Sequence, residues 1–164
     1  TRIAIETSAG RVPVLANVSE TSTREALRFI DGANALGVDG YMLMPSVIYV
    51  ADAREAMANV RAMAEAARKP VMIYNNPIAY RVDLKPEHMV ELADCAWIVA
   101  IKESCGDTRR ITDLRNALVM CWVTATSCFW ASMTWPSRDS RWAATVCWPA
   151  WAAHSRARLW PCTI

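Results

Sequence analysis

Two side chains of this sequence have the types and positions needed to form an imine. A lysine amine attacks a keto carbon only in its neutral form, and burial at the end of an apolar strand lowers the pKa of such an amine. Lys102 ends the apolar run 97–102 and so has this setting. A phenol such as that of Tyr74 can carry protons to and from the carbonyl oxygen while the imine forms. The pair therefore predicts Schiff-base chemistry on a ketone.

Two predicted strands and the helix between them must bring these side chains together. The runs 70–74 and 97–102 are apolar and are predicted as buried parallel strands. Segment 86–93 has an early proline and apolar residues at three- and four-residue spacing, which is typical of a capped helix. Successive strands of such a unit are neighbours, so their ends lie roughly 5 Å apart. We expect Tyr74 and Lys102 to share one pocket.

A purely structural interpretation of both residues stays open. Many strands of α/β proteins end in a lysine that only reaches solvent, and a tyrosine before Asn75-Asn76-Pro77 can be a turn residue that only packs. Short motifs of this kind carry a real false-positive risk. The spacing alone does not decide between packing and catalysis.

Short motifs also follow one another in a fixed order along the first part of the chain. In chain order they are 10–16, 37–41, Tyr74-Asn75-Asn76-Pro77, Val82-Asp83-Leu84 and Ile101-Lys102-Glu103-Ser104, with Gly106-Asp107 close behind. As a set they resemble the dihydrodipicolinate synthase and N-acetylneuraminate lyase family of class I pyruvate aldolases, over about residues 1–118. The resemblance implies an eight-stranded α/β barrel and a Schiff base between Lys102 and pyruvate or a related 2-oxo acid. It also implies proton relay by Tyr74, no cofactor, and a homo-oligomer for the complete enzyme.

The chain departs from the family members that make dihydrodipicolinate in two places. Those members carry two adjacent tyrosines after the fourth strand, where this chain has the single Tyr49, out of register. They also carry an arginine two residues after the proline of the tyrosine motif, where this chain has Ala79. In the family that arginine holds the carboxylate of aspartate semialdehyde. Tyr49 and Arg81 could replace the family's tyrosines and arginine, but a packing tyrosine and a solvated arginine are the simpler interpretations. We expect a different aldolase, lyase or dehydratase of the family, and the substrate-binding residues stay unknown.

The alternating pattern predicts an α/β fold, a partial (β/α)8 TIM barrel of about four βα units that correspond to strands 3 to 6 of the family. Further strands are expected at 12–18 and 39–44, and further helices at 22–36, 52–68 and 107–117. A complete barrel has about 250 residues, whereas this chain has 164 and begins with Thr1. We expect the family's first two strands to be absent. The loop that binds the carboxylate of pyruvate in the family is expected to be absent with them.

The predicted barrel domain 1–118 is followed by a tail, 119–164, of different composition. Every glycine lies at or before Gly106 and every lysine at or before Lys102, while seven of the eight tryptophans follow Leu118. A frame shifted by two bases turns Met133-Thr134-Trp135-Pro136 into Asp-x-Ala with any codon choice. We therefore predict an irregular, frameshifted tail that begins near Val119. A membrane segment over 119–137 is the alternative, and its serines, threonines and Pro136 make it a poor span.

The remaining composition argues against other classes of protein. A formal charge of +2 predicts no nucleic-acid partner and no anionic membrane surface. No C-x-x-C pair occurs, and neither His88 nor His154 has ligand partners at useful spacing, so no metal site is predicted. Cys95 and Cys105 are expected to be reduced thiols of a cytoplasmic protein. Cys105 is close to Lys102 in the sequence and could be reactive, but a small, half-buried packing residue is the simpler interpretation.

Two functional hypotheses from different classes follow. The first is a Schiff-base-forming lyase or synthase that acts on a small 2-oxo acid. The second is a non-catalytic gene fragment that keeps the tyrosine and the lysine but cannot close a barrel, because open strand edges leave N–H and C=O groups unpaired. Under the second hypothesis the chain is aggregation-prone and inactive.

Overall fold

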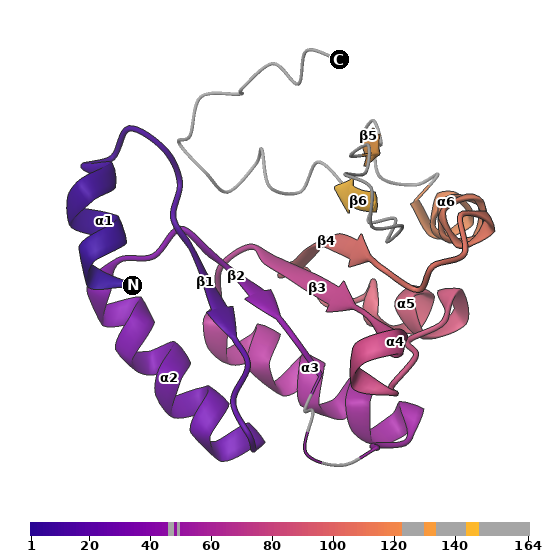
Figure 1. The fold of residues 1–164 in the computed structure, drawn as a ribbon, viewed down its shortest axis with the longest axis horizontal. Coiled ribbons are helices and arrows are strands. Elements are labelled where there is room, and N and C mark those ends of the chain that lie inside the picture. Colours follow the sequence, from indigo (N-terminus) through magenta and orange to yellow (C-terminus); the bar gives the residue numbers. More distant parts are fainter. Residues whose placement is uncertain (46–47, 49, 123–129, 134–143, 148–164) are drawn as a thin grey trace.

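The computed structural model describes residues 1–45, 48, 50–122, 130–133 and 144–147 (Figure 1). A sheet with the strand order β1-β2-β3-β4-β6-β5 crosses the molecule, and its last two strands are β6 (Ala144–Cys147) and β5 (Trp130–Met133). Its first four strands are parallel and follow the chain order. They are β1 (Leu15–Val18), β2 (Gly40–Leu43), β3 (Val71–Asn75) and β4 (Ile98–Glu103). This is the partial (β/α)8 barrel that the sequence predicts.

Helices connect and cover these strands. In chain order they are α1 (Arg2–Ser8), α2 (Thr23–Leu36), α3 (Ala53–Ala67), α4 (Pro77–Tyr80), α5 (Pro86–Leu92) and α6 (Arg109–Trp122). The side chains between the sheet and α2 are apolar, with Ile30 and Tyr41 fully buried. The hydroxyl of Tyr41 donates a hydrogen bond to the carbonyl of Ile30, 3.1 Å away. The side of β2 that carries Tyr41 therefore faces α2.

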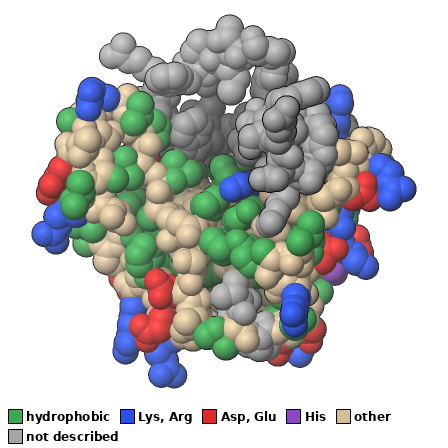
Figure 2. Space-filling model, viewed as in Figure 1, with side chains coloured by type: hydrophobic (Ala, Val, Ile, Leu, Met, Phe, Trp, Pro, Cys, Tyr) green, Lys and Arg blue, Asp and Glu red, His purple; other side chains and the backbone are tan. Residues whose placement is uncertain are grey.

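Alternation along β3 gives the sheet two different faces. Val71, Ile73 and Asn75 are fully buried, whereas Met72 and Tyr74 between them are half-buried. Successive side chains of a strand point to opposite faces, so Tyr74 lies on the face away from the helices. That face would line the interior of a closed barrel. On the face of the molecule shown in Figure 2, hydrophobic side chains gather toward the centre and most charged side chains lie toward the margin.

Local capping explains where the two long helices begin. Ser22 accepts a hydrogen bond from the Glu25 N–H at the start of α2. At the start of α3, the side chain of Asp52 accepts from the Glu55 N–H at 2.8 Å, and the side chain of Glu55 accepts from the Asp52 N–H at 3.1 Å. This reciprocal capping box satisfies two N–H groups that the helix itself leaves unpaired.

We expect Asp52→Ala to lower the free energy of unfolding by about 0.5–2 kcal/mol, because the variant leaves an N–H group of α3 without its acceptor. Urea denaturation of the two proteins measures the difference. Asp52→Asn is the matched control, since asparagine caps helices about as well as aspartate. Equal losses in the alanine and asparagine variants would contradict a capping role for Asp52.

The predicted elements are confirmed in type and order, with ends that differ by up to five residues. The prediction missed α4, a single turn after the proline of the tyrosine motif. It also ended the last helix at 117, whereas α6 continues to Trp122. The predicted boundary after Leu118 therefore falls inside a helix. Among the described residues no helix has the length and apolar character that a membrane crossing needs.

Two short segments of the predicted tail form strands. They are β5 (Trp130–Met133) and β6 (Ala144–Cys147), which pair with each other and, through β6, with β4. Both pairings are antiparallel, whereas the strands of a (β/α)8 barrel are all parallel. These two strands thus extend the sheet but do not continue the barrel. The other predictions for the tail, including His154 and most of the segment 119–137, lie outside the described residues.

Candidate active site

Tyr74 and Lys102 lie side by side at the carboxyl ends of β3 and β4. The two residues are direct partners in the parallel pairing of these strands. The amine of Lys102 stands over the face of the Tyr74 ring, with Nζ 3.9 Å from the ring centroid. Both side chains are half-buried. The expected adjacency is therefore confirmed, while the burial predicted for Lys102 is only partial.

The phenol of Tyr74 also has two partners from the segment that follows it. Asn76 donates a hydrogen bond from Nδ2 to the Tyr74 hydroxyl oxygen at 3.0 Å. The ring of Tyr80 meets the ring of Tyr74 edge-on, with centroids 5.7 Å apart and planes at 90°, a favourable geometry for two aromatic rings. Burial, together with the charge and hydrogen bond of Tyr74, raises the pKa of Tyr80.

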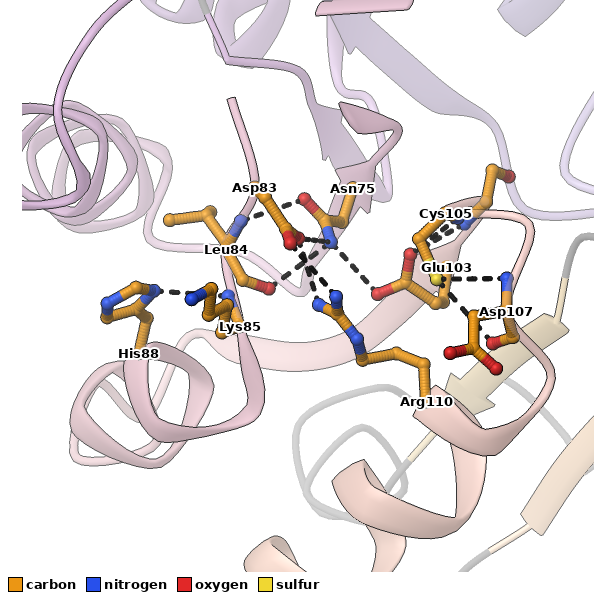
Figure 3. Close-up of polar contacts among 10 residues, drawn as sticks. Asn75, Asp83, Leu84, Lys85, His88, Glu103, Cys105, Asp107 and Arg110 are labelled. Atoms are coloured by element: carbon orange, nitrogen blue, oxygen red, sulfur yellow. Dashed lines mark hydrogen bonds and ion pairs between the residues drawn. The ribbon is translucent and has the colours of Figure 1, made fainter. Parts of the chain in front are cut away.

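A buried polar network lies behind this pair, on the helix-facing side of the sheet (Figure 3). Asn75 and Glu103 are the buried polar residues of the described core, at 0% and 3% exposure. Asn75 Nδ2 donates to a Glu103 carboxylate oxygen at 2.9 Å and to the Leu84 carbonyl at 3.2 Å. Asn75 Oδ1 accepts from the Leu84 N–H at 3.1 Å. The other Glu103 oxygen accepts from the N–H groups of Ser104 and Cys105, each at 2.9 Å.

An ion pair between Arg110 and Asp83 completes the network. The guanidinium of Arg110, on α6, donates two parallel hydrogen bonds of 2.9 Å to the carboxylate of Asp83 (Figure 3). Arg110 holds the pKa of Asp83 below its ordinary value, and the hydrogen bond from Asn75 acts in the same direction. Burial raises the pKa of Glu103, an effect that the hydrogen bond from Asn75 and the charge of Arg110 oppose.

The network fixes the strand ends that carry the two candidate catalytic residues. Asn75 follows Tyr74 directly and Glu103 follows Lys102 directly, so the hydrogen bond between them crosslinks β3 and β4 one residue beyond the pair. Asn75 attaches the loop before α5 through Leu84, and Arg110 joins the start of α6 to that loop through Asp83. The sequence motifs did not predict this role for Asn75, Glu103, Asp83 or Arg110. Polar residues at the end of otherwise apolar strands were the available signal.

The other residues singled out from the sequence lie apart from the pair. Arg81 and Ala79 are exposed, and Tyr49 lies outside the described residues. The Nδ1 of His88 accepts from the Lys85 N–H at the start of α5, a capping contact. Cys95 is buried, and burial raises the pKa of the half-buried Cys105, which disfavours a reactive thiolate. Within the described part of the chain no three His, Cys, Asp or Glu residues gather as a metal site would require.

Parallel strands joined by helices, with a lysine and a tyrosine paired at their carboxyl ends, define part of a (β/α)8 barrel of the type that carries its active site at this edge. The chain belongs to the dihydrodipicolinate synthetase family, whose sequence model matches residues 1–123. This match confirms the resemblance inferred from the motifs and reaches a few residues past the predicted limit at 118.

Curated relatives and solved structures agree with this membership. The chain is 33% identical over 112 residues to the 4-hydroxy-tetrahydrodipicolinate synthase of Roseobacter denitrificans, and 36% identical over 109 residues to that of Sphingopyxis alaskensis. These matches cover 68% and 66% of this chain but 38% and 37% of the relatives. The chain therefore spans less than half the length of the relatives that it matches.

Two similar solved structures contain pyruvate. One is the chloride-inhibited dihydrodipicolinate synthase of Acinetobacter baumannii, which is 32% identical to this chain with a TM-score of 0.67. The match covers 71% of this chain and 40% of that one. The other is YagE, a prophage protein of Escherichia coli K12, 26% identical with a TM-score of 0.69, which covers 73% of this chain and 41% of that one.

Proposed function

We propose that Lys102 forms a Schiff base with pyruvate or a related 2-oxo acid and that Tyr74 relays protons, in a lyase or synthase reaction. The observation that carries the proposal is the position of the Lys102 amine, 3.9 Å from the centroid of the Tyr74 ring at the ends of adjacent parallel strands. An amine and a phenol at this edge of a barrel are the groups that imine chemistry requires.

The proposed reaction follows from these two groups. The neutral amine adds to the keto carbon, and the carbonyl oxygen takes a proton to give a carbinolamine. Tyr74 gives this proton and is restored by the proton that the nitrogen then loses. A second proton from Tyr74 lets the hydroxyl leave as water, so that amine, ketone and one proton become a protonated imine and water. The protonated imine withdraws electrons from the neighbouring carbon, which allows a carbon–carbon or carbon–oxygen bond to be made or broken.

Membership of the family and the two pyruvate complexes support a 2-oxo acid as the substrate class. The choice of second substrate depends on residues in which this chain departs from the family pattern. Ala79 has no charge, and the nearby Arg81 is exposed at the end of α4. We therefore propose that the chain is an aldolase, lyase or dehydratase whose second substrate is not aspartate semialdehyde. The relatives above are named as synthases of 4-hydroxy-tetrahydrodipicolinate.

The activity, cytoplasmic location and homo-oligomeric assembly of the whole enzyme stay predictions, because the chain spans 38% of its relative from Roseobacter denitrificans. A non-catalytic fragment is the second candidate. The antiparallel pairing of β6 with β4 favours it, since this pairing occupies the edge where a barrel needs a parallel strand.

The test of the proposal is to locate the imine on the 164-residue chain. The protein is incubated with pyruvate and sodium borohydride, which reduces an imine to a stable secondary amine, and the modified peptide is mapped by mass spectrometry. We expect the adduct on Lys102. The chain offers two internal controls: Lys69, whose amine donates to the Val38 carbonyl, and the exposed Lys85. An adduct on either control instead, or none at all, would contradict the proposal and favour the non-catalytic candidate.

A further inference from the structure

Asn76 uses the two ends of its side-chain amide for different purposes. Its Oδ1 accepts a hydrogen bond from the Ala79 N–H at 3.2 Å and so caps α4. Its Nδ2 donates to the hydroxyl oxygen of Tyr74 at 3.0 Å. One half-buried side chain thus connects the turn after β3 with the phenol that stands against Lys102.

The capping contact determines the direction of the contact with Tyr74. An amide has an acceptor end and a donor end, and the backbone N–H of Ala79 can bond only to the acceptor. The NH₂ group must then face Tyr74, so the phenol oxygen is the acceptor in that bond. Because the oxygen accepts there, the phenol's own proton is free to point elsewhere. The donated N–H also stabilises the negative charge on that oxygen while its proton is away.

The helix that Asn76 caps restrains the ring of Tyr74 as well. The single turn of α4 ends at Tyr80, whose ring packs edge-on against Tyr74. Lys102 covers the face of the same ring. Asn76 therefore restrains the phenol twice, by a direct bond to its oxygen and through the helix that places Tyr80.

We infer that Asn76 is a positioning residue for proton transfer: it keeps the Tyr74 hydroxyl oriented to give its proton to the substrate. The inference rests on the proposed function and extends it by one residue. It assigns Asn76 a role through Tyr74 and no contact with the reacting atoms.

Two substitutions separate this role from simple capping. Asn76→Asp retains an acceptor for the Ala79 N–H, and aspartate is as good a cap as asparagine. It replaces the donor with a carboxylate oxygen, so the Tyr74 hydroxyl must now donate its proton to that oxygen. Asn76→Ala removes both contacts. A capping role predicts loss in the alanine variant only, whereas a positioning role predicts loss in both.

The rate of borohydride trapping with pyruvate, measured as a function of pH, is the first readout. We expect Asn76→Asp to slow trapping about five- to tenfold, the effect of about one hydrogen bond, with a changed pH profile and an unchanged unfolding midpoint. In a Tyr74→Phe background the same substitution should have no further effect on the rate. A normal rate in Asn76→Asp, or an equal slowing in the phenylalanine background, would overturn the inference.

A second readout needs no pyruvate and therefore separates the inference from the proposed function. Infrared difference spectra of protein with isotope-labelled tyrosine, with the Tyr74→Phe spectrum subtracted, isolate the C–O stretching band of Tyr74. We expect this band to shift in Asn76→Asp, because the hydroxyl changes from acceptor to donor. If the unchanged protein forms no adduct, the proposed function fails while a shifted band still supports the orienting contact. An unshifted band overturns the inference in either case.

Discussion

Replacement of Tyr74 by phenylalanine is expected to slow imine formation at Lys102 by about 10²–10⁴-fold, the usual effect of losing a general acid or base. The variant keeps the ring that packs against Tyr80 and the Lys102 amine, and it loses only the hydroxyl, which accepts from Asn76 and interacts with Tyr80. The unfolding midpoint should therefore change little. The rate of borohydride trapping with pyruvate, with the adduct mapped to its lysine, is the measurement.

Tyr80→Phe is the matched control for this experiment. It deletes a second hydroxyl within the same aromatic pair and keeps the edge-on contact at 5.7 Å. The Tyr80 hydroxyl interacts with Tyr74 but not with the Lys102 amine in any described interaction, so its loss should slow trapping far less than loss of the Tyr74 hydroxyl. Comparable slowing in both variants would show that the Tyr80 hydroxyl is needed as much as that of Tyr74, and normal trapping in Tyr74→Phe would remove Tyr74 from the mechanism.

The sequence was sufficient to predict the strands and long helices, because each has a periodic signal of its own. The runs ending at Tyr74 and Lys102 are short, apolar and bounded by turn residues, which is how buried parallel strands look. Helix α4 has only four residues and so no periodicity to detect. Its one signal was Asn76-Pro77, an N-cap residue followed by a proline at the first helical position.

The polar network could not be assigned from the sequence for a different reason. Asn75 and Glu103 are 28 positions apart in the chain, and their hydrogen bond depends on the register between β3 and β4. Each looked like the first polar residue after a strand. Only the pairing of Tyr74 with Lys102, one position earlier, places both side chains on the buried face. The antiparallel pairing of β6 with β4 was likewise outside the reach of periodicity, because four-residue strands carry almost no pattern.

The same network gives the largest expected effect on stability. Asn75→Leu is close to an isosteric change at a fully buried position, and it leaves the Leu84 N–H and carbonyl and one Glu103 oxygen without their partner. Each buried group without a partner costs about 1–3 kcal/mol, and more when it is charged. We expect the free energy of unfolding at neutral pH to fall by about 3–5 kcal/mol, as measured by urea denaturation.

The size of this loss should depend on pH. Burial raises the pKa of Glu103 in the folded protein, so the stability of the fold decreases as pH rises and this carboxyl ionises. Asp83 has a lowered pKa, so its contribution is present above the pKa of the unfolded chain and is lost on acidification. The hydrogen bonds from Asn75 lower both pKa values. Removing them therefore destabilises the ionised forms, and the loss in Asn75→Leu should be larger near pH 7 than near pH 4.

Glu103→Gln provides the control for the buried charge. In that background position 103 no longer titrates, so the effect of Asn75→Leu should vary less between pH 4 and pH 7 than it does in the unchanged protein. The residual variation reports on Asp83, which keeps its two bonds to Arg110. A loss in Asn75→Leu that is the same at both pH values in both backgrounds would mean that Asn75 stabilises the fold by packing and by its bonds to the Leu84 backbone, and not by its bonds to the ionised carboxylates. The ends of β3 and β4 would then be held by the backbone ladder, without the help of ionised Glu103.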